Sequence, residues 1–248
     1  MSVDVYFFEP IEPTASRMET SLHRQLKLAY AVSAAHTEVN FATFRIDAIS
    51  HADELVEVQH ASLGALKAKV RHLLDHADGR VVRIVKPIVA RKWIVTRQSP
   101  GGPTLRRRLS PKKGQLSDIF LDLVHFTALF PHPRLTLEVV LVDTEEHRVP
   151  KAKHRFRRKN YVTLEQSLIA IQQRFELRGA VDLWGLLPKV KLPASFDTAE
   201  LARQIERPRW FAQKVAYCLR SCDAIRVIGK SGNSQLYTRP KHRRPRAA

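Results

Sequence analysis

The chain has 248 residues, of which 44% are hydrophobic, and a formal net charge of +18, so it is long enough for a sizeable core and too basic for an acidic binding protein. Its two cysteines exclude a disulfide framework, its apolar runs are too short to span a membrane, and its N-terminus does not resemble a signal peptide. We therefore expect a cytoplasmic protein without a membrane segment.

The elements predicted along residues 1–148 alternate between helices and strands, which indicates a mixed α/β domain. In chain order the expected elements are a helix over 15–31, one or two strands over 38–49, a strand over 54–59, a helix from Ser62 to about Leu74, two strands separated at Pro87 within 80–98, a basic loop over 105–114, a helix over 116–130 and a strand over 135–143.

The remaining residues read differently. A charged linker over 149–160 precedes a helix that Thr163 and Gln166 open as a capping box, and Asp197 with Glu200 forms a second capping box. A helix over 209–222 and two short strands about a Gly- and Ser-rich turn complete a domain over 161–240, which is followed by a basic tail over 241–248.

The positive charge is concentrated in this C-terminal part. Residues 1–150 contain 20 basic and 17 acidic residues, whereas residues 151–248 contain 22 basic and 7 acidic residues. Without residues 239–248 the second part still has 17 basic residues. The distribution predicts a polyanionic partner held mainly by the C-terminal third. A solubilising surface is the alternative.

The stretch 196–239 resembles a winged helix-turn-helix: a short helix, a tight turn, a longer helix and a hairpin wing. The resemblance covers roughly residues 160–240. It implies that the second helix enters the major groove and that the wing contacts phosphates. Docking of a protein is the alternative use of this fold. The residues implied for DNA contact are Arg207, Arg209, Trp210, Gln213 and Lys214 on the helix, and Arg226, Lys230 and Arg239 on the wing.

Polar side chains interrupt the apolar strands of the first domain. Asp47 lies on one predicted strand, and Glu57 and Gln59 lie on the next. Residues two apart in a strand point to the same face, so Glu57 and Gln59 share a face that Asp47 reaches across the turn. Two converging carboxylates suit Mg²⁺ or Mn²⁺. The alternative is the polar face of a hairpin, which the spacing alone favours.

The order of elements around these residues resembles the PD-(D/E)xK restriction-endonuclease-like superfamily over roughly residues 15–97. The resemblance implies a mixed sheet flanked by helices, with Asp47 as the first acid, Glu57-Val58-Gln59 as the (D/E)xK element and Glu19 as a helix acid that often joins them. The stretch 55–70 also resembles uncharacterised bacterial proteins that pair such a domain with a C-terminal winged helix.

The sequence departs from the superfamily at Gln59, which stands where the motif has Lys. An amide orients water but supplies neither a positive charge nor a base. Lys67 or Lys69 on the next helix is the alternative source of charge, and Lys67 is the better placed. Both lysines as solvated residues, and Glu19 as the capping-box partner of Ser16, are the structural alternatives.

A basic segment follows the strands. Residues 97–113 contain six basic residues and no acid, and we expect them to contact the nucleic-acid backbone as a loop. A solvated loop is the alternative. The candidate contacts are Arg106, Arg107, Arg108, Lys112 and Lys113.

The sequence therefore predicts a metal-dependent DNA endonuclease that cuts with its N-terminal domain and binds with its winged helix. The rival is a DNA-binding adaptor or transcriptional regulator that has lost activity, and Gln59 favours it. DNA is the expected partner. A homodimer, and a partner protein of a multi-component DNA-processing or defence system, are left open.

Overall fold

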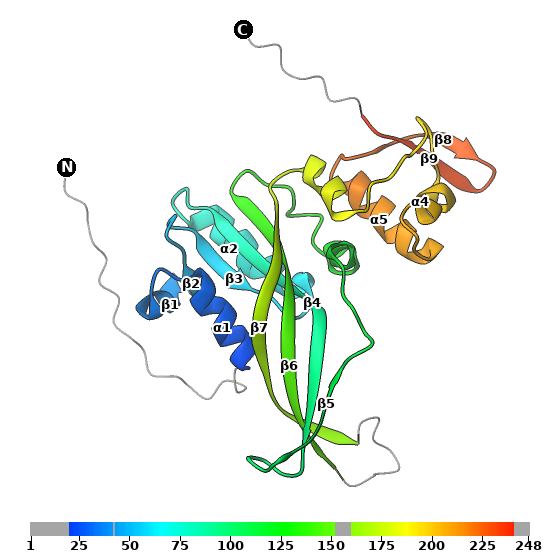
Figure 1. Cartoon of the computed structure of the whole chain (residues 1–248). Coiled ribbons are helices and arrows are strands. Elements are labelled where there is room, and N and C mark those ends of the chain that lie inside the picture. The colour runs from blue at the N-terminus through cyan, green and yellow to red at the C-terminus, as the bar shows by residue number, and fades with distance from the viewer. Residues whose placement is uncertain (1–19, 42, 152–159, 241–248) are drawn as a thin grey trace, which may run out of the picture.

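A computed structural model describes residues 20–41, 43–151 and 160–240. Its elements surround one large sheet (Figure 1). In chain order they are α1 (Ser21–Tyr30), η1 (Ala34–His36), β1 (Thr37–Phe41), β2 (Phe44–Ile49), β3 (Leu55–Val58), η2 (Leu63–Leu66), α2 (Lys67–His76), β4 (Val82–Arg97), β5 (Thr104–Leu109), η3 (Leu116–Ile119), α3 (Phe120–Leu123), β6 (Leu135–Pro150), β7 (Tyr161–Leu177), η4 (Ala180–Leu186), α4 (Thr198–Gln204), α5 (Arg209–Ser221), β8 (Arg226–Ser231) and β9 (Ser234–Thr238).

The sheet is mixed. Its strands lie in the order β1-β2-β3-β4-β6-β7, and β5 pairs with β4 beside that path. β3, β4 and β6 are parallel, and the other neighbours are antiparallel. The chain thus runs through α1, an antiparallel meander, the crossover helix α2 and a parallel strand. The α/β class and the strands predicted over 38–49 and 54–59 are confirmed.

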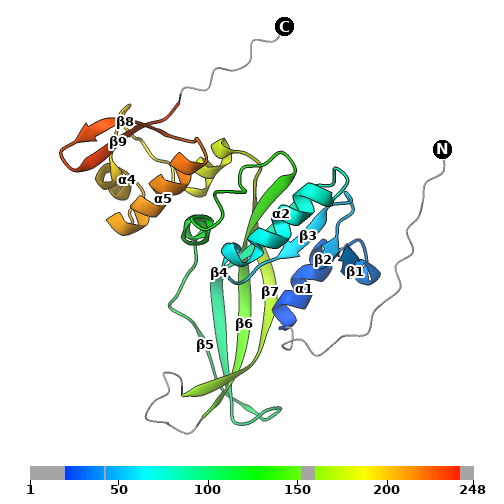
Figure 2. The same cartoon turned by 180° about the vertical axis from the view of Figure 1, so that it is seen from behind.

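Helices cover both faces of the sheet. Leu22 and Leu26 of α1 pack on one face against Val56 and Val85, and α2 covers the opposite face with Val70 and its neighbours (Figure 2). The Ser62 hydroxyl caps the η2 turn that leads into α2 by accepting from the Gly64 N–H at 3.2 Å. None of the described helices is long and apolar enough to cross a bilayer.

The prediction of two strands separated at Pro87 is wrong, because β4 runs unbroken from Val82 to Arg97. β3 ends beside Val85, whose carbonyl accepts from the Gln59 N–H at 2.9 Å. Residue 87 faces the same edge of β4 as Val85, because residues two apart in a strand direct their backbone groups to the same side. β3 has already ended there, so an N–H at position 87 would have no acceptor in β3. Proline is tolerated there because its missing N–H has no partner to lose.

The helix predicted from Thr163 is also wrong, because residues 161–177 form β7 and pair with β6 along their whole length. The register shifts three times along this pair. Each bulge adds a residue and breaks the two-residue alternation that identifies a strand in a sequence. The opening of the expected C-terminal domain therefore lies in the large sheet.

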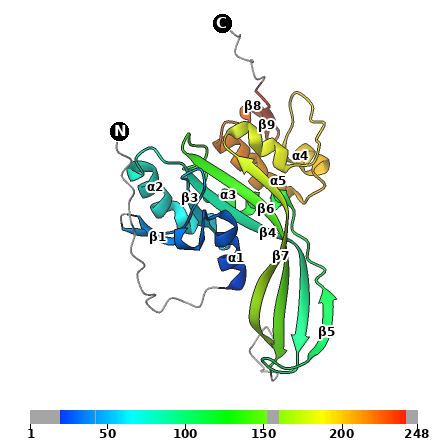
Figure 3. The ribbon, with the colours of Figure 1, turned by 60° about the vertical axis from the view of Figure 1, so that its left-hand side comes forward.

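The C-terminal halves of β4 and β6 and the N-terminal half of β7 extend beyond the helices (Figure 3). These three half-strands form an arm of the sheet, and β5 pairs along one edge of it. The loop predicted over 105–114 is wrong in its first half, because Thr104–Leu109 forms strand β5 and pairs antiparallel with Trp93–Arg97. The helix expected over 116–130 is shorter than predicted: η3 and α3 end at Leu123, and turns follow. Phe120, Leu123 and Phe126 recur every third residue, which suits 3₁₀ turns with i to i+3 hydrogen bonds.

The C-terminal elements are two helices, α4 and α5, joined by a short turn and followed by a hairpin. Asp197 caps α4, because its carboxylate accepts from the N–H groups of Ala199 at 2.9 Å and Glu200 at 2.8 Å. β8 and β9 pair antiparallel. The buried face of α5, which includes Phe211 and Val215, shares one apolar cluster with α2 and α3. This pair of helices is therefore packed against the large sheet and its helices. Of the linker and tail expected from the sequence, residues 152–159 and 241–248 lie outside the described residues.

Candidate active site

Two carboxylates lie where β2 and β3 separate. The last main-chain pair of the two strands toward this end joins Ala48 and Val56. Beyond it, Asp47 Oδ2 accepts from the Val58 N–H at 2.8 Å, and Glu57 Oε1 accepts from the Asp47 N–H at 3.3 Å. Side-chain carboxylates thus accept main-chain N–H groups where the ladder between the two strands ends. These reciprocal hydrogen bonds hold the two acids side by side.

Basic side chains approach the acids from both faces of the sheet. From α1, His23 Nε2 lies 3.5 Å and Lys27 Nζ lies 3.8 Å from Asp47 Oδ1. Lys27 also forms an ion pair with Glu38, and it is only 3% exposed. From α2, Lys69 forms an ion pair with Glu57 Oε1. The charges are therefore balanced within a largely dehydrated cluster, in which each interaction is stronger than in water.

The two acids differ in their acidity. Burial raises the pKa of Glu57 to about 7, with the negative charge of Asp47 acting in the same direction and Lys69 opposing both. Burial also acts to raise the pKa of Asp47, but the hydrogen bond and charge of His23, the Val58 N–H and Lys27 outweigh it and leave that pKa below its usual range. One acid is thus held ionised and the other titrates near neutrality.

Gln59 lies beside the acids but its side chain bonds elsewhere. Its amide nitrogen donates to the Ser62 carbonyl at 2.9 Å, in the turn that precedes η2. The structure places Lys69, rather than Lys67, at the Glu57 carboxylate. Lys67 forms no ion pair with either acid in the described part of the chain, so Lys69 and not Lys67 lies at the Glu57 carboxylate, and a catalytic role for Lys67 stays a prediction. Glu19 lies outside the described residues.

Sequence reasoning missed a buried lysine next to this site. Lys86 is 5% exposed. Its ammonium donates to the carbonyls of His60 at 3.0 Å and Ala61 at 2.6 Å and pairs with Asp122 at 2.9 Å. Lys86 therefore ties the loop after Gln59 to α3. A lysine between Val85 and Pro87 in an otherwise apolar strand was the available signal.

The acids offer oxygen donors of the kind that Mg²⁺ accepts, from one or two carboxylates completed by water and phosphate oxygens. Asp47 and Glu57 fit this small protein contribution. Among the residues that the structure describes, no group of three or more His, Cys, Asp or Glu side chains is placed to hold a metal. A metal here would depend on non-protein ligands for the rest of its coordination shell.

The residues proposed for DNA contact on α5 and in the turn before it divide into two groups. Arg207 is held by the sheet domain, because it donates to Asp118 at 2.7 Å and to Gln115 at 3.2 Å. Arg209 reaches the hairpin through Ser234 at 3.0 Å. The outward members of the helix are Trp210, Gln213 and Lys214.

The remaining basic candidates lie on the hairpin and the arm. Arg226 and Lys230 are exposed on β8, and Arg239 lies over the Trp184 ring at 4.6 Å. On β5, Arg107 pairs with Glu145 at 2.9 Å and lies over Trp93. The side chains left exposed on β5 and the loop after it are Arg106, Arg108, Lys112 and Lys113.

Two comparisons relate this chain to known proteins. The model of a family described as a domain of unknown function (DUF8091) matches residues 20–178, a range that begins one residue before α1 and ends one residue after β7. An uncharacterised protein of Treponema pallidum (strain Nichols) is 30% identical over 185 residues, which cover 75% of this chain and 72% of the relative. No solved structure matches. The chain belongs to the DUF8091 family.

Proposed function

We propose that the protein is a metal-dependent DNA endonuclease of the restriction-endonuclease-like type, which acts in the cytoplasm and hydrolyses phosphodiester bonds at Asp47 and Glu57. The observation that carries the proposal is the reciprocal pair of hydrogen bonds that holds both carboxylates where β2 and β3 separate. The surrounding order of α1, meander, α2 and parallel strand is the order that the superfamily resemblance implies.

In this proposal Asp47 and Glu57 would hold Mg²⁺ or Mn²⁺, which when bound activates water and stabilises charge on the phosphodiester. Lys69 supplies the positive charge that Gln59 lacks, from α2 instead of β3. His23 and Lys27 keep Asp47 ionised. The Gln59 amide holds the loop that leads into η2.

DNA binding is assigned to α4, α5 and the β8–β9 hairpin, the elements that the winged-helix resemblance covers. The order α4, α5, β8 and β9 agrees with that assignment. Residues 178–240, which follow β7 and include these elements, contain 11 basic and 5 acidic residues, an excess of positive charge of the kind that favours a polyanion. The exposed basic residues of β5 and the following loop would extend this surface along the backbone.

A second candidate function is a DNA-binding adaptor or regulator without catalysis. The arrangement of charges favours it: Glu57 is engaged by Lys69, and Asp47 faces His23 and Lys27. Such a cluster is stable without a metal, because its negative charges are already neutralised. A cleavage assay separates the two functions.

The test incubates the full chain with plasmid, linear duplex, branched and single-stranded DNA, each with Mg²⁺, Mn²⁺ or EDTA. The nuclease proposal predicts cleavage of at least one substrate with metal and none with EDTA. Retention of DNA in a gel-shift assay without cleavage of any substrate by either metal would establish the adaptor instead.

A further inference from the structure

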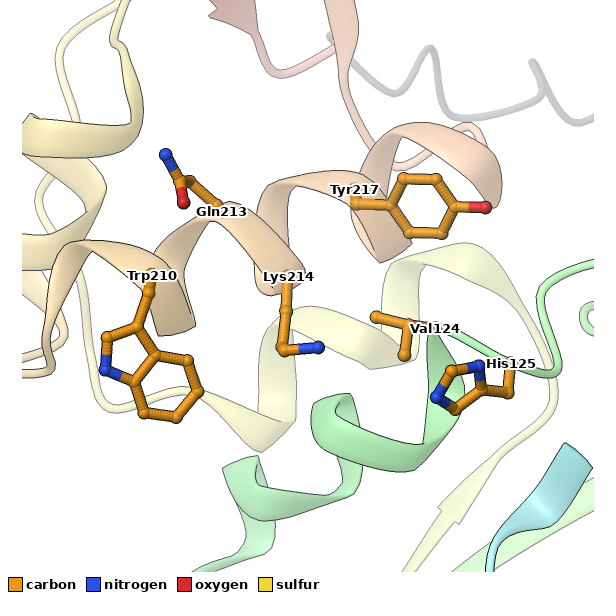
Figure 4. Close-up of a pocket in the computed structure, with 6 residues that line it drawn as sticks. All are labelled: Val124, His125, Trp210, Gln213, Lys214 and Tyr217. Atoms are coloured by element: carbon orange, nitrogen blue, oxygen red, sulfur yellow. The ribbon is translucent and has the colours of Figure 1, made fainter.

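A groove separates the outward face of α5 from the end of α3 (Figure 4). Its volume is about 490 Å³, and its walls are Val124 and His125 on one side and Trp210, Gln213, Lys214 and Tyr217 on the other. The α5 residues follow one another at helical spacing, so they form one stripe. The outward face of α5 is therefore one wall of a groove whose other wall follows α3.

Two large aromatic rings in this groove remain in contact with solvent. Trp210 is 54% exposed and Tyr217 is 43% exposed. They lie two helical turns apart, with the Lys214 side chain between them and directed towards Val124 and His125 (Figure 4). Exposed Trp and Tyr rings with a cation between them are the components of a surface on which nucleic-acid bases stack.

The groove is suited to a negatively charged occupant. α5 carries Arg209, Lys214 and Arg220 and contains no acidic residue. A buried apolar partner helix would need a groove without a lysine in its centre, since a desolvated ammonium without a partner is costly. A nucleic-acid strand with unpaired bases suits this groove, because its bases can stack on the rings and its phosphates can bind the ammonium.

Contacts connect the groove with the candidate active site. A Cβ at Gly64, in η2, would lie 3.3 Å from the His125 Cβ, so the groove wall packs directly on the turn after β3. Asp122, two residues before Val124, pairs with Lys86, which holds the His60 and Ala61 carbonyls. A nucleic-acid strand lying in the groove would thus be next to the loop that follows Glu57 and Gln59.

We infer that this groove binds unpaired bases of single-stranded DNA, stacked on Trp210 and Tyr217, with Lys214 on the phosphates. The inference rests on the proposed action on DNA and names its substrate class: DNA with an unpaired segment beside the cleavage site. It makes α5 a stacking surface, whereas a winged helix that reads duplex DNA inserts this helix into the major groove.

The test measures the affinity of the full chain, in EDTA so that no cleavage occurs, for a fluorescein-labelled oligomer of 12 thymidines. An abasic oligomer of about the same length keeps the phosphates and removes the bases. We expect the thymidine oligomer to bind about 10-fold or more tightly than the abasic oligomer. The double variant Trp210→Ala/Tyr217→Ala should lose that difference and leave the abasic affinity unchanged.

Trp210→Phe, which keeps a ring, should retain most of the difference, and Leu28→Ala, an exposed apolar residue of α1, is the matched control. Thermal melting shows that each variant is folded. Equal wild-type affinity for both oligomers, or no binding of either, as a groove reserved for a protein segment would give, overturns the inference. Base-dependent binding without nuclease activity supports the stacking of bases in the groove and refutes only the proposed nuclease function. Metal-dependent cleavage without base-dependent binding supports the nuclease function and refutes the stacking.

Discussion

The Lys69 ammonium forms an ion pair with Glu57 Oε1, although the two residues lie on different elements of the fold. In the proposed nuclease, Lys69 would supply from α2 the positive charge that Gln59 cannot supply. The cation is therefore placed by the packing of α2 on the sheet.

Lys69→Ala should lower metal-dependent cleavage by about 100-fold, the effect of removing one group that stabilises charge in a transition state. Lys67→Ala is the matched control, because Lys67 lies on the same helix and forms no ion pair with Glu57 in the described part of the chain. Initial rates on the preferred substrate give the measurement. Equal losses in the two variants would show that Lys69 has no special role.

Gln59→Lys in the Lys69→Ala background should recover part of the lost rate, because it returns a cation to the strand position of the motif. The same substitution in the wild type should change the rate little, since Lys69 already occupies the Glu57 carboxylate. Rates of the wild type, Lys69→Ala, Gln59→Lys and the double variant form a double-mutant cycle. Independent effects of the two substitutions would argue against a shared position.

The stability of the metal-free protein should depend on Glu57 between pH 4.5 and pH 7. Burial raises the pKa of Glu57 from 4.5 to about 7, so the folded state holds a proton that the unfolded state has released. This contribution is fully present below the lower pKa and is lost as the pH rises through the upper one. The pKa of Asp47 lies below 3.8, so that residue adds no slope in this window.

The measurement is urea unfolding of wild type and Glu57→Gln in EDTA at several pH values from 5 to 8, a range chosen from those pKa values. The stability of Glu57→Gln relative to wild type should rise with pH. Asp75→Asn, an exposed acid of α2, should follow the wild-type profile. A constant difference between wild type and Glu57→Gln would contradict the raised pKa.

Arg83 should be a principal determinant of stability. It donates to Glu54 at 2.6 and 2.9 Å, to Glu138 at 2.6 Å and to Glu176 at 2.7 Å. Glu138 is only 2% exposed. Arg83→Met should lower the free energy of unfolding by about 3–5 kcal/mol, because it leaves buried carboxylates without their main cation.

Arg80→Ala is the control for that experiment. Its partner Asp53 lies at 3.1 Å, but the Asp53 side chain is 63% exposed. A solvated pair of this kind contributes about 0–1 kcal/mol. Chemical denaturation of both variants gives the comparison, and similar losses would show that burial does not govern these ion pairs.

The sequence was sufficient where local patterns decide the structure. Apolar residues between turn signals identified β2 and β3, and Asp197 identified the start of α4 because a cap bonds only to its own helix. The same reasoning placed Asp47 and Glu57 on adjacent strands. The pair was therefore predictable before its geometry was known.

Local sequence patterns failed to predict the structure where contacts with residues distant in the sequence determine it. β7 is a strand because β6 offers an edge of equal length, and its bulges hide the alternation. Pro87 lies inside β4 because β3 has ended, which no local pattern shows. Lys69 and Lys86 reach the site by the packing of α2 and by the path of β4, so spacing in the sequence could not rank them against Lys67.

The comparison of wild type with Asp47→Asn tests the central claim most directly. Asparagine removes the charge of one acid and keeps its size, and Asp75→Asn removes an exposed charge from α2 as the control. Cleavage of the preferred DNA with Mg²⁺ or Mn²⁺ should be abolished in Asp47→Asn and retained in Asp75→Asn, with DNA binding unchanged in both. Equal trace cleavage by wild type and Asp47→Asn would contradict a catalytic site at Asp47 and Glu57.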